Sequence, residues 1–273
     1  MGRPSHGTFP MGREIIYNVY LCKVKDMISK NKIKEIRALE RKKIRSAEGL
    51  FVAEGPKVVG DLMQKYLPQM FVHTPQWKAP SGMCDDIVVT EEELQRVSFL
   101  QHPQQVLAVF HIQKEGEEVY PTNELSLALD GIQDPGNLGT IIRIADWFGI
   151  RRVYCSEETA DVYNPKVVQA TMGSLARVQV CYTDLEQLVT SLPSNYPVYG
   201  TLLEGDDLYE SDLTANGLIV MGNEGNGISA QLRRSIQRKL LIPCYQVADM
   251  RPDSLNVAVA TAVAVAEFRR RGR

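Results

Sequence analysis

Apolar positions along the first half of the chain predict short buried strands separated by amphipathic helices. Residues 29–45 carry apolar side chains at helical spacing, at Ile33, Ile36, Leu39 and Ile44, and the pattern ends before Gly49. Further helices are predicted at 56–65 and 91–97, and strands at 51–53, 70–72, 87–89 and 106–112. This rhythm indicates a small α/β domain.

The second half repeats the alternation more clearly. Strands are predicted at 125–129, 152–155, 178–181, 198–202, 217–221 and 239–242, and helices at 139–148, 166–171, 185–191, 230–236 and 255–268. Apolar strands that are bounded by glycine and separated by helices favour a parallel sheet covered on both faces. The polar, proline-containing stretch 113–123 has the composition of a linker, so we place domains at 27–115 and 116–273.

Length and composition agree with two domains of an ordinary globular protein. The chain has 273 residues, of which 44% are hydrophobic and 23% charged, which disfavours disorder, collagen and disulfide-scaffold classes. Residues 1–26 lack a clear core pattern. They are predicted to be an N-terminal extension or leader, with an added strand at 15–21 as the alternative.

Charge is segregated although the net charge is only -2. Residues 27–57 are rich in Lys and Arg, and the C-terminus ends with Arg269, Arg270, Arg271 and Arg273. The basic helix at 30–45 is either a solvated face or, with the arginine tail, a surface for RNA phosphates.

The spacing of the cysteines and the hydropathy of the chain indicate the cellular compartment of the protein. Five dispersed cysteines without a CxxC pair suggest neither a zinc site nor a disulfide framework, and they fit a reducing cytoplasm. The longest small-apolar run, 255–266, has about 12 residues where a membrane span needs roughly 20. We therefore expect no membrane association and no metal.

Three loops that follow predicted strands are the candidate functional segments, because ligands of open parallel sheets bind at the carboxyl ends of strands. They are 129–139, the glycine-rich 221–227, and the segment from Ile242 to Asn256. The order GNEGNG differs from the dinucleotide GxGxxG, and no GxxxxGK[ST] motif is present. The glycines serve either as turns or as points of close approach to a ligand.

Histidine is confined to the first half, at His6, His73, His102 and His111. A Ser/His/Asp triad or an HExxH zinc site within the second domain is therefore excluded. Any proton handling there must use Arg, Glu, Ser, Asn or water.

Together the three loops resemble the SpoU (TrmH-type) family of RNA 2'-O-ribose methyltransferases, of the SPOUT class. The first motif, DGIQDPGNLGTIIRIA, starts at Asp130 and carries the family's asparagine and arginine as Asn137 and Arg143. The second, IVMGNEGNGI, carries the glutamate as Glu224, and the third, Ile242-Pro followed by SLNVAVA, carries Ser254 and Asn256. Residues 29–55 resemble the small RNA substrate-binding domain that often precedes the catalytic domain.

The resemblance implies a C-terminal parallel sheet with a deep trefoil knot, a homodimer, and S-adenosyl-methionine as cofactor. The implied cofactor-binding residues are Thr201, Leu202, Gly222, Ile242 and Leu255. The loop between Pro243 and Ser254 departs from the family, because it is long and contains Asp249, Arg251 and Pro252 where a short glycine turn is usual.

The implied acceptor is a ribose 2'-hydroxyl of RNA, a group that DNA lacks. Arg143 is assigned to this hydroxyl, but a guanidinium normally keeps its proton above about pH 12. We expect Arg143 to bind phosphate and hydroxyl and to stabilise the developing alkoxide, with base action as an open alternative. The other four catalytic candidates, Asn137, Glu224, Ser254 and Asn256, would orient Arg143, RNA or cofactor.

Several alternatives remain open at this point. The preferred substrate is guanosine in rRNA, because a substrate-binding domain precedes the catalytic one, and the others are tRNA and a catalytically silent RNA-binding or ribosome-assembly role. Methylation of a base is disfavoured, since the NxxxxxR and SLN pattern belongs to the ribose enzymes. Glu224 could support a helix near Ile228, and Ser254 is suited to cap the last helix.

Overall fold

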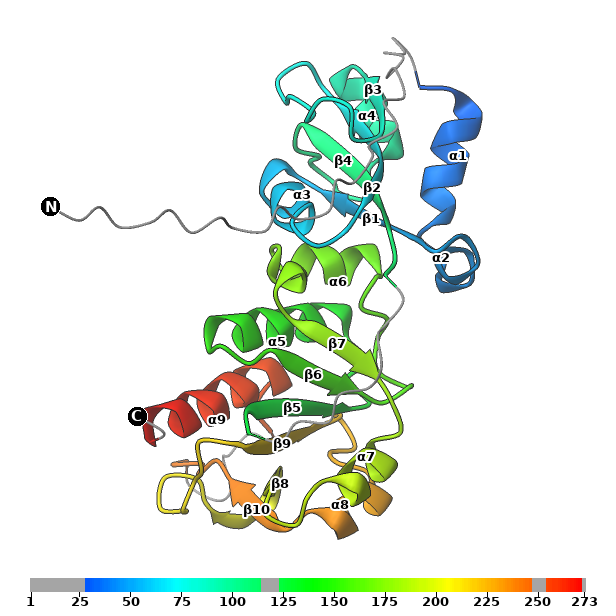
Figure 1. Cartoon of the computed structure of the whole chain (residues 1–273). Helices are drawn as coiled ribbons and strands as arrows, with labels where there is room; N and C mark the ends of the chain where they lie inside the picture. The colour runs from blue at the N-terminus through cyan, green and yellow to red at the C-terminus, as the bar shows by residue number, and fades with distance from the viewer. Residues whose placement is uncertain (1–27, 114–122, 247–253, 272–273) are drawn as a thin grey trace, which may run out of the picture.

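The computed structural model describes residues 28–113, 123–246 and 254–271, and it contains two sheets, one above the other (Figure 1). The predictions for residues 1–26 lie outside the described residues. The upper sheet has the order β1-β4-β2-β3 and the lower one β10-β8-β9-β5-β6-β7. The predicted α/β class is therefore confirmed for both sheets.

The upper unit is a mixed sheet with helices on both faces. Its strands are β1 (Leu50–Glu54), β2 (Pro68–His73), β3 (Asp85–Val88) and β4 (Val106–His111), and its helices are α1 (Lys30–Ala38), α2 (Lys42–Glu48), α3 (Pro56–Leu62) and α4 (Glu91–Val97). Successive β1 residues point to opposite faces: Val52 packs in a cluster with residues of α1 and α4, and Phe51 packs in the cluster that contains α3.

The lower unit is a six-stranded sheet in which every pairing is parallel, as predicted. Its strands are β5 (Leu125–Asp130), β6 (Arg152–Cys155), β7 (Gln179–Tyr182), β8 (Val198–Asp207), β9 (Gly217–Gly222) and β10 (Arg238–Leu241). Its helices are α5 (Pro135–Trp147), α6 (Pro165–Ala170), the 3-10 turn η1 (Ser174–Ala176), α7 (Leu185–Ser191), α8 (Ala230–Ser235) and α9 (Val257–Arg271).

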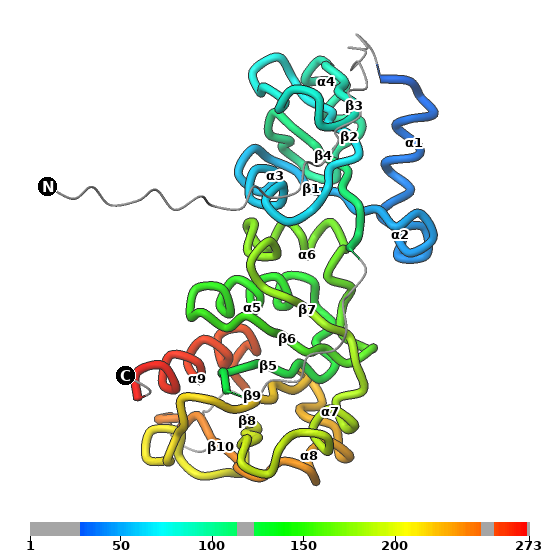
Figure 2. The backbone as a smooth tube through the Cα atoms, in the orientation of Figure 1, coloured from blue at the N-terminus to red at the C-terminus, as the bar shows by residue number. Residues whose placement is uncertain are grey.

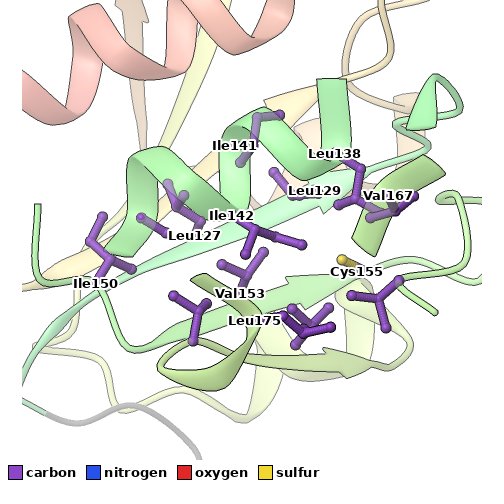
Figure 3. Packing of buried hydrophobic residues seen from close by; sticks show 14 of the residues in the cluster. Leu127, Leu129, Leu138, Ile141, Ile142, Ile150, Val153, Cys155, Val167 and Leu175 are labelled. Atoms are coloured by element: carbon purple, nitrogen blue, oxygen red, sulfur yellow. The ribbon is translucent and has the colours of Figure 1, made fainter. Parts of the chain in front are cut away.

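Helices cover both faces of the lower sheet. Leu127 and Leu129 of β5 pack under α5, as Figure 3 shows, and the cluster extends to α6 and α9. Ala128 points to the other face and packs with residues of α7 and α8. Fully buried parallel strands need such double coverage, and the continuous apolar runs of the sequence reflect it.

The prediction of one helix at 29–45 is wrong, because this segment forms two helices. α1 ends at Ala38, Leu39 and Glu40 form a turn, and α2 starts at Lys42. Arg45, expected on a basic face, is buried, and its Nη1 donates to the carbonyls of Leu39 and Glu40, at 2.8 and 2.6 Å. A buried guanidinium thus satisfies the carbonyls at the break, which helical periodicity alone cannot reveal.

The two units share one continuous hydrophobic cluster. Figure 2 shows the backbone of the upper unit lying against α6. The ring of Phe51 in β1 lies 5.0 Å from that of Tyr66 and 4.8 Å from that of Tyr163, which precedes α6. Arg45 Nε also donates to Asp161 Oδ2 of the lower unit at 3.1 Å. The upper unit is therefore held on α6 by both apolar and charged contacts.

Candidate active site

Four of the five predicted cofactor residues lie at or just after the carboxyl ends of paired segments in three neighbouring strands, and the fifth, Leu255, precedes α9. β10, β8 and β9 are adjacent and parallel, so their carboxyl ends meet at one edge of the sheet. Gly222 ends β9, Ile242 follows β10, and Thr201 comes directly after the last β8 residue paired with β9. The sheet thus brings together residues that are up to about 40 positions apart in the sequence.

β8 bulges at this edge. Its pairing with β10 passes from Gly200 opposite Lys239 to Asp206 opposite Leu240, so residues 201–205 lie outside the ladder. Within this bulge Thr201 Oγ1 donates to the Val220 carbonyl at 3.3 Å, which ties it to β9. The bulge therefore presents backbone groups that the neighbouring strand does not use.

Apolar side chains accompany these strand ends. Leu202 and Ile242 are half-buried, and Leu255, just before α9, is 50% exposed. Leu202 packs against the cluster that includes α7 and α8, and Ile242 packs against the cluster that includes α5 and α9, so these two side chains border opposite faces of the sheet.

Gly222 has a structural requirement of its own. A Cβ at this position would lie 2.3 Å from both Gly227 C and Ile228 N, because the loop folds back and Asn223 pairs with Gly227. Any side chain there would force the loop apart. The glycine run is thus explained first by a tight turn, the alternative that the sequence left open.

Asn223 and Asp130 were quoted within the motifs, but their roles were missed. Asn223 Nδ2 donates to the Gly131 carbonyl at 2.7 Å, and its Oδ1 accepts from the amides of Gly225 and Asn226. Asp130 Oδ2 accepts from the Ser229 amide at 2.7 Å. These two side chains join the first and second loops, and the available signal was an Asx residue beside glycine at each strand end.

Asn137 is the central residue of a hydrogen-bonded chain that links all three loops. Its Nδ2 donates to Glu224 Oε1 at 2.8 Å, and its Oδ1 accepts from Asn256 Nδ2 at 3.0 Å. Asp134 caps α5 by accepting from the Asn137 amide at 2.8 Å, so the helix start fixes this side chain. Three of the five predicted catalytic residues are therefore in contact.

The last helix is capped by Asn256 and not by Ser254. Asn256 Oδ1 accepts from the amides of Ala258 and Val259, at 3.0 and 3.3 Å. The reason is position: α9 starts at Val257, so Asn256 is the residue before it, and Ser254 is two positions too early. Ser254 is exposed at the same segment. Glu224 likewise does not cap α8, whose N-cap position is Ser229.

Arg143 lies apart from the hydrogen-bonded residues Glu224, Asn137 and Asn256. It is six residues after Asn137 on α5, a rise of about 9 Å and a different helix face. Arg143 shares its exposed stripe with Thr140 and with Trp147, which is 85% exposed. Among the described residues, the Arg143 guanidinium has no hydrogen bond or ion pair, so it is available to a ligand or to another subunit.

The described parts of the chain contain neither a cluster of metal-ligating residues nor a helix suited to cross a membrane. These residues include no group of three or more His, Cys, Asp and Glu arranged to hold a metal ion. None of the helices in these parts combines the length and the apolar character that a membrane span requires.

Comparison with sequence families gives two matches. Residues 124–266 match the model of the SpoU rRNA methylase family, and residues 30–108 match an MRM3-like substrate binding domain. A relative from Bacillus subtilis, the 23S rRNA (guanosine(2553)-2'-O)-methyltransferase RlmP, is 32% identical over 244 residues, covering 87% of this chain and 96% of that protein.

Two solved structures are similar over nearly the whole chain. A protein of the TrmH family from Porphyromonas gingivalis has 40% identity and a TM-score of 0.81, over 90% of this chain and all of the other. The AdoMet-bound rRNA methyltransferase of Sinorhizobium meliloti has 31% identity and a TM-score of 0.80, over 91% and 98%.

Proposed function

The chain belongs to the SpoU rRNA methylase family and is an S-adenosyl-methionine-dependent RNA 2'-O-ribose methyltransferase, and we propose that its substrate is a guanosine of ribosomal RNA. Similarity to RlmP along almost the full chain supports both the RNA class and the nucleoside. The hydrogen-bonded chain from Glu224 through Asn137 to Asn256 is the observation that carries the site, because it joins the three loops.

The strand ends fit S-adenosyl-methionine. Backbone groups of the β8 bulge at 201–205 suit the polar edge of an adenine, and the partly covered Leu202, Ile242 and Leu255 suit its faces. Gly222 keeps the loop tight enough to form one side of the site. When bound, the cofactor supplies a sulfonium methyl group for transfer to the ribose 2'-oxygen.

Arg143 is our proposed contact for the acceptor ribose. Its guanidinium would bind the phosphate and 2'-hydroxyl and stabilise the negative charge that develops on the oxygen during attack. Asn137, Glu224 and Asn256 would hold the three loops at fixed separations, and Ser254 would contact RNA or cofactor. Positioning of this kind contributes much of the rate in reactions that need only an aligned nucleophile.

A homodimer completes the proposal. α5 and α9 pack side by side and together expose Trp147 and Val259, which are 85% and 51% exposed. Large apolar side chains on adjacent helices favour a protein interface. Arg143 lies on the same exposed stripe of α5 as Trp147, so we propose that it contributes to the site of the other subunit.

The trefoil knot, the domain boundary and the compartment are also proposals. β10 is at the edge of the sheet, whereas α9 packs on α5 and β9, so the chain after Ile242 must return across the neighbouring strands. The two sheets and the two family matches support a division at 115/116. The scattered cysteines support the cytoplasm.

Methyl transfer to RNA tests the function. Protein-free 23S rRNA and bulk tRNA would be incubated with methyl-labelled S-adenosyl-methionine, digested to nucleosides and analysed by mass. We expect 2'-O-methylguanosine from rRNA. Label on tRNA alone would overturn the proposed substrate, and label on a base would overturn the proposed site of modification. If neither RNA were labelled although the cofactor binds, the catalytic role would be overturned.

Arg143→Ala tests the assigned residue. We expect kcat to fall about 100- to 1000-fold, the usual cost of removing one donor to a developing oxyanion. Cofactor affinity, measured by calorimetry, should be unchanged. Arg151→Ala is the matched control, because Arg151 is an exposed arginine soon after α5 and is outside the proposed site. Equal activity of both variants would remove Arg143 from the mechanism.

A further inference from the structure

A hollow of about 500 Å³ opens in the upper unit, away from the strand ends described above. It is formed by the start of α3, the turn after β2, helix α4 and the loop that leads into β4. Its polar lining includes four glutamines together with an acid and a histidine, namely Gln76, Gln95, Gln104, Gln105, Glu91 and His102. The volume is within the range of small-ligand sites.

The loop over residues 98–105 is fixed at its start by a buried carboxylate. Glu54, at the end of β1, accepts from the Phe99 amide at 2.8 Å and from the Ser98 hydroxyl. Arg37 of α1 donates to the Ser98 carbonyl and lies 4.8 Å over the Phe99 ring. Burial raises the pKa of Glu54, which the hydrogen bonds from Ser98 and Phe99 oppose.

The end of the loop is fixed as well, in a conformation that glutamine rarely adopts. The Gly55 amide donates to the Val106 carbonyl and the Thr74 amide to the Gln105 carbonyl, both at 2.8 Å. Gln105 has φ 51°, in the left-handed region that favours glycine. The hydrogen bond from the Thr74 amide holds Gln105 in this conformation, so the end of the loop is fixed together with its start.

The glutamine side chains are available to a ligand. Among the described residues, those of Gln76, Gln104 and Gln105 form no hydrogen bond. Each carboxamide offers a donor and an acceptor side by side, the pattern that pairs with the edge of a nucleobase. Of the described residues that line the hollow, none is Lys or Arg, and Glu91 would repel a phosphate.

We propose that this hollow binds an unpaired nucleobase of the RNA substrate, read through the glutamine carboxamides and the Glu91 carboxylate. The inference rests on the proposed function for the identity of the ligand, because the hollow lies within the segment similar to a substrate binding domain. RNA is read in sequence mainly through unstacked bases whose edges are accessible. A preformed loop limits the entropy lost when such a base binds.

Direct RNA binding tests the proposal independently of methyl transfer. Filter binding with 23S rRNA would compare the wild type with the double variant Gln76→Ala/Gln104→Ala. We expect the Kd to rise about tenfold or more, since a bidentate base contact is worth that much discrimination. Gln101→Ala is the control, because Gln101 is exposed in the same loop but does not line the hollow.

An abasic scan identifies the ligand as a base. The RNA fragment protected by the wild type would be resynthesised with single abasic residues. One abasic position should weaken wild-type binding by the same factor as the double variant, and should have no further effect on the variant. Additive losses at every position would overturn the proposal, as would a Kd of the double variant within twofold of the wild type.

Kinetics separate this proposal from the proposed function. For an active enzyme, the double variant should raise the KM for RNA and leave kcat and cofactor affinity within twofold. If the wild type binds RNA through the hollow but transfers no methyl group, the function fails and the base site stands. A fall in kcat with an unchanged KM would assign these glutamines to folding or chemistry and contradict a base site.

Discussion

At the scale of single residues, Asn137 shows why one side-chain type is required where three loops meet. Its carboxamide donates to Glu224 and accepts from Asn256 at the same time. Aspartate would place a second acceptor against Glu224, and leucine would remove both hydrogen bonds between the loops. The sequence motifs identified these three residues as candidates, but the direction and order of the hydrogen bonds follow only from their positions in the fold.

The C-terminal arginines are another feature that the sequence could not resolve. Arg269 Nε donates to the Phe148 carbonyl at 2.8 Å, at the end of α5, and Arg271 Nη1 donates to the Ser211 carbonyl at 2.7 Å. Charge alone suggested a tail for phosphate contact. The fold instead uses these two guanidinium groups to fasten the last helix to neighbouring segments.

Glu267 should make the protein's stability depend on acid pH. Hydrogen bonds from Arg270 and Arg271 to this buried carboxylate lower its pKa to about 2, below the ordinary 4.5. The stabilisation is therefore complete above pH 4.5 and is lost as the pH falls towards 2. We expect Glu267→Gln to lower the free energy of unfolding at pH 7 and to match the wild type near pH 2.

Urea unfolding at pH 7, 4 and 3 would measure this difference. Glu210→Gln provides the control, because Glu210 is exposed and its side chain lies outside this cluster. A deficit of Glu267→Gln that stays constant from pH 7 to pH 3 would contradict the lowered pKa.

At the scale of helices and strands, the periodicity of apolar residues predicted which helices and strands form better than it predicted the residues at which they start and end. α5 starts at Pro135, four residues before the prediction, because Asp134 caps it and proline fits a first turn. β8 runs to Asp207, beyond the predicted end at 202, because it resumes pairing with β10 after its bulge. Caps and bulges depend on hydrogen-bond partners that an apolar pattern does not encode.

The link between α2 and the lower unit should be strong enough to measure. Arg45 is 2% exposed, and it joins the turn after α1 to Asp161. Removing one partner of a buried ion pair leaves an uncompensated charge, at a cost of about 3–5 kcal/mol. We expect Asp161→Asn to lower the free energy of unfolding by up to this amount.

Chemical denaturation monitored by fluorescence would test this link. Asp212→Asn is a suitable control, because Asp212 is exposed and lies outside this ion pair. If Asp161→Asn unfolds at the same urea concentration as the wild type, the pair adds nothing to the attachment of the two units.

At the scale of the whole molecule, the proposed dimer makes each site depend on two subunits. Mixing Arg143→Ala with Glu224→Ala should restore activity, because one site of a heterodimer then has both residues intact. Val259→Arg should give a mass near 30.6 kDa in light scattering, where we expect twice that for the wild type, together with little methyl transfer.

Each inactive variant mixed with itself is the control for subunit exchange. No recovery in the mixed sample, despite exchange shown by a tagged subunit, would mean that each chain forms a complete site alone. A monomeric wild type with full activity would exclude the dimer altogether.

The two α/β sheets could be predicted from the sequence, whereas the contacts between the two units could not. Continuous apolar strands indicated the parallel sheet, and the motif order indicated which loops meet at its edge. The hollow in the upper unit depends on Glu54, a buried acid within an apolar strand, and on Gln105 at an unusual φ. Neither leaves a periodic signal, because both act through contacts distant in sequence.

The continuous core between the two units also fixes the distance between the upper hollow and the strand ends of the lower sheet. Phe51, Tyr66 and Tyr163 form one aromatic group, so any shift of the upper sheet over α6 would break these contacts. These contacts fix the distance between the hollow and the strand ends. The enzyme would then select the target nucleotide by its distance along the RNA from the base bound in the hollow. Insertion of a single nucleotide between the two would shift the modified position along the RNA.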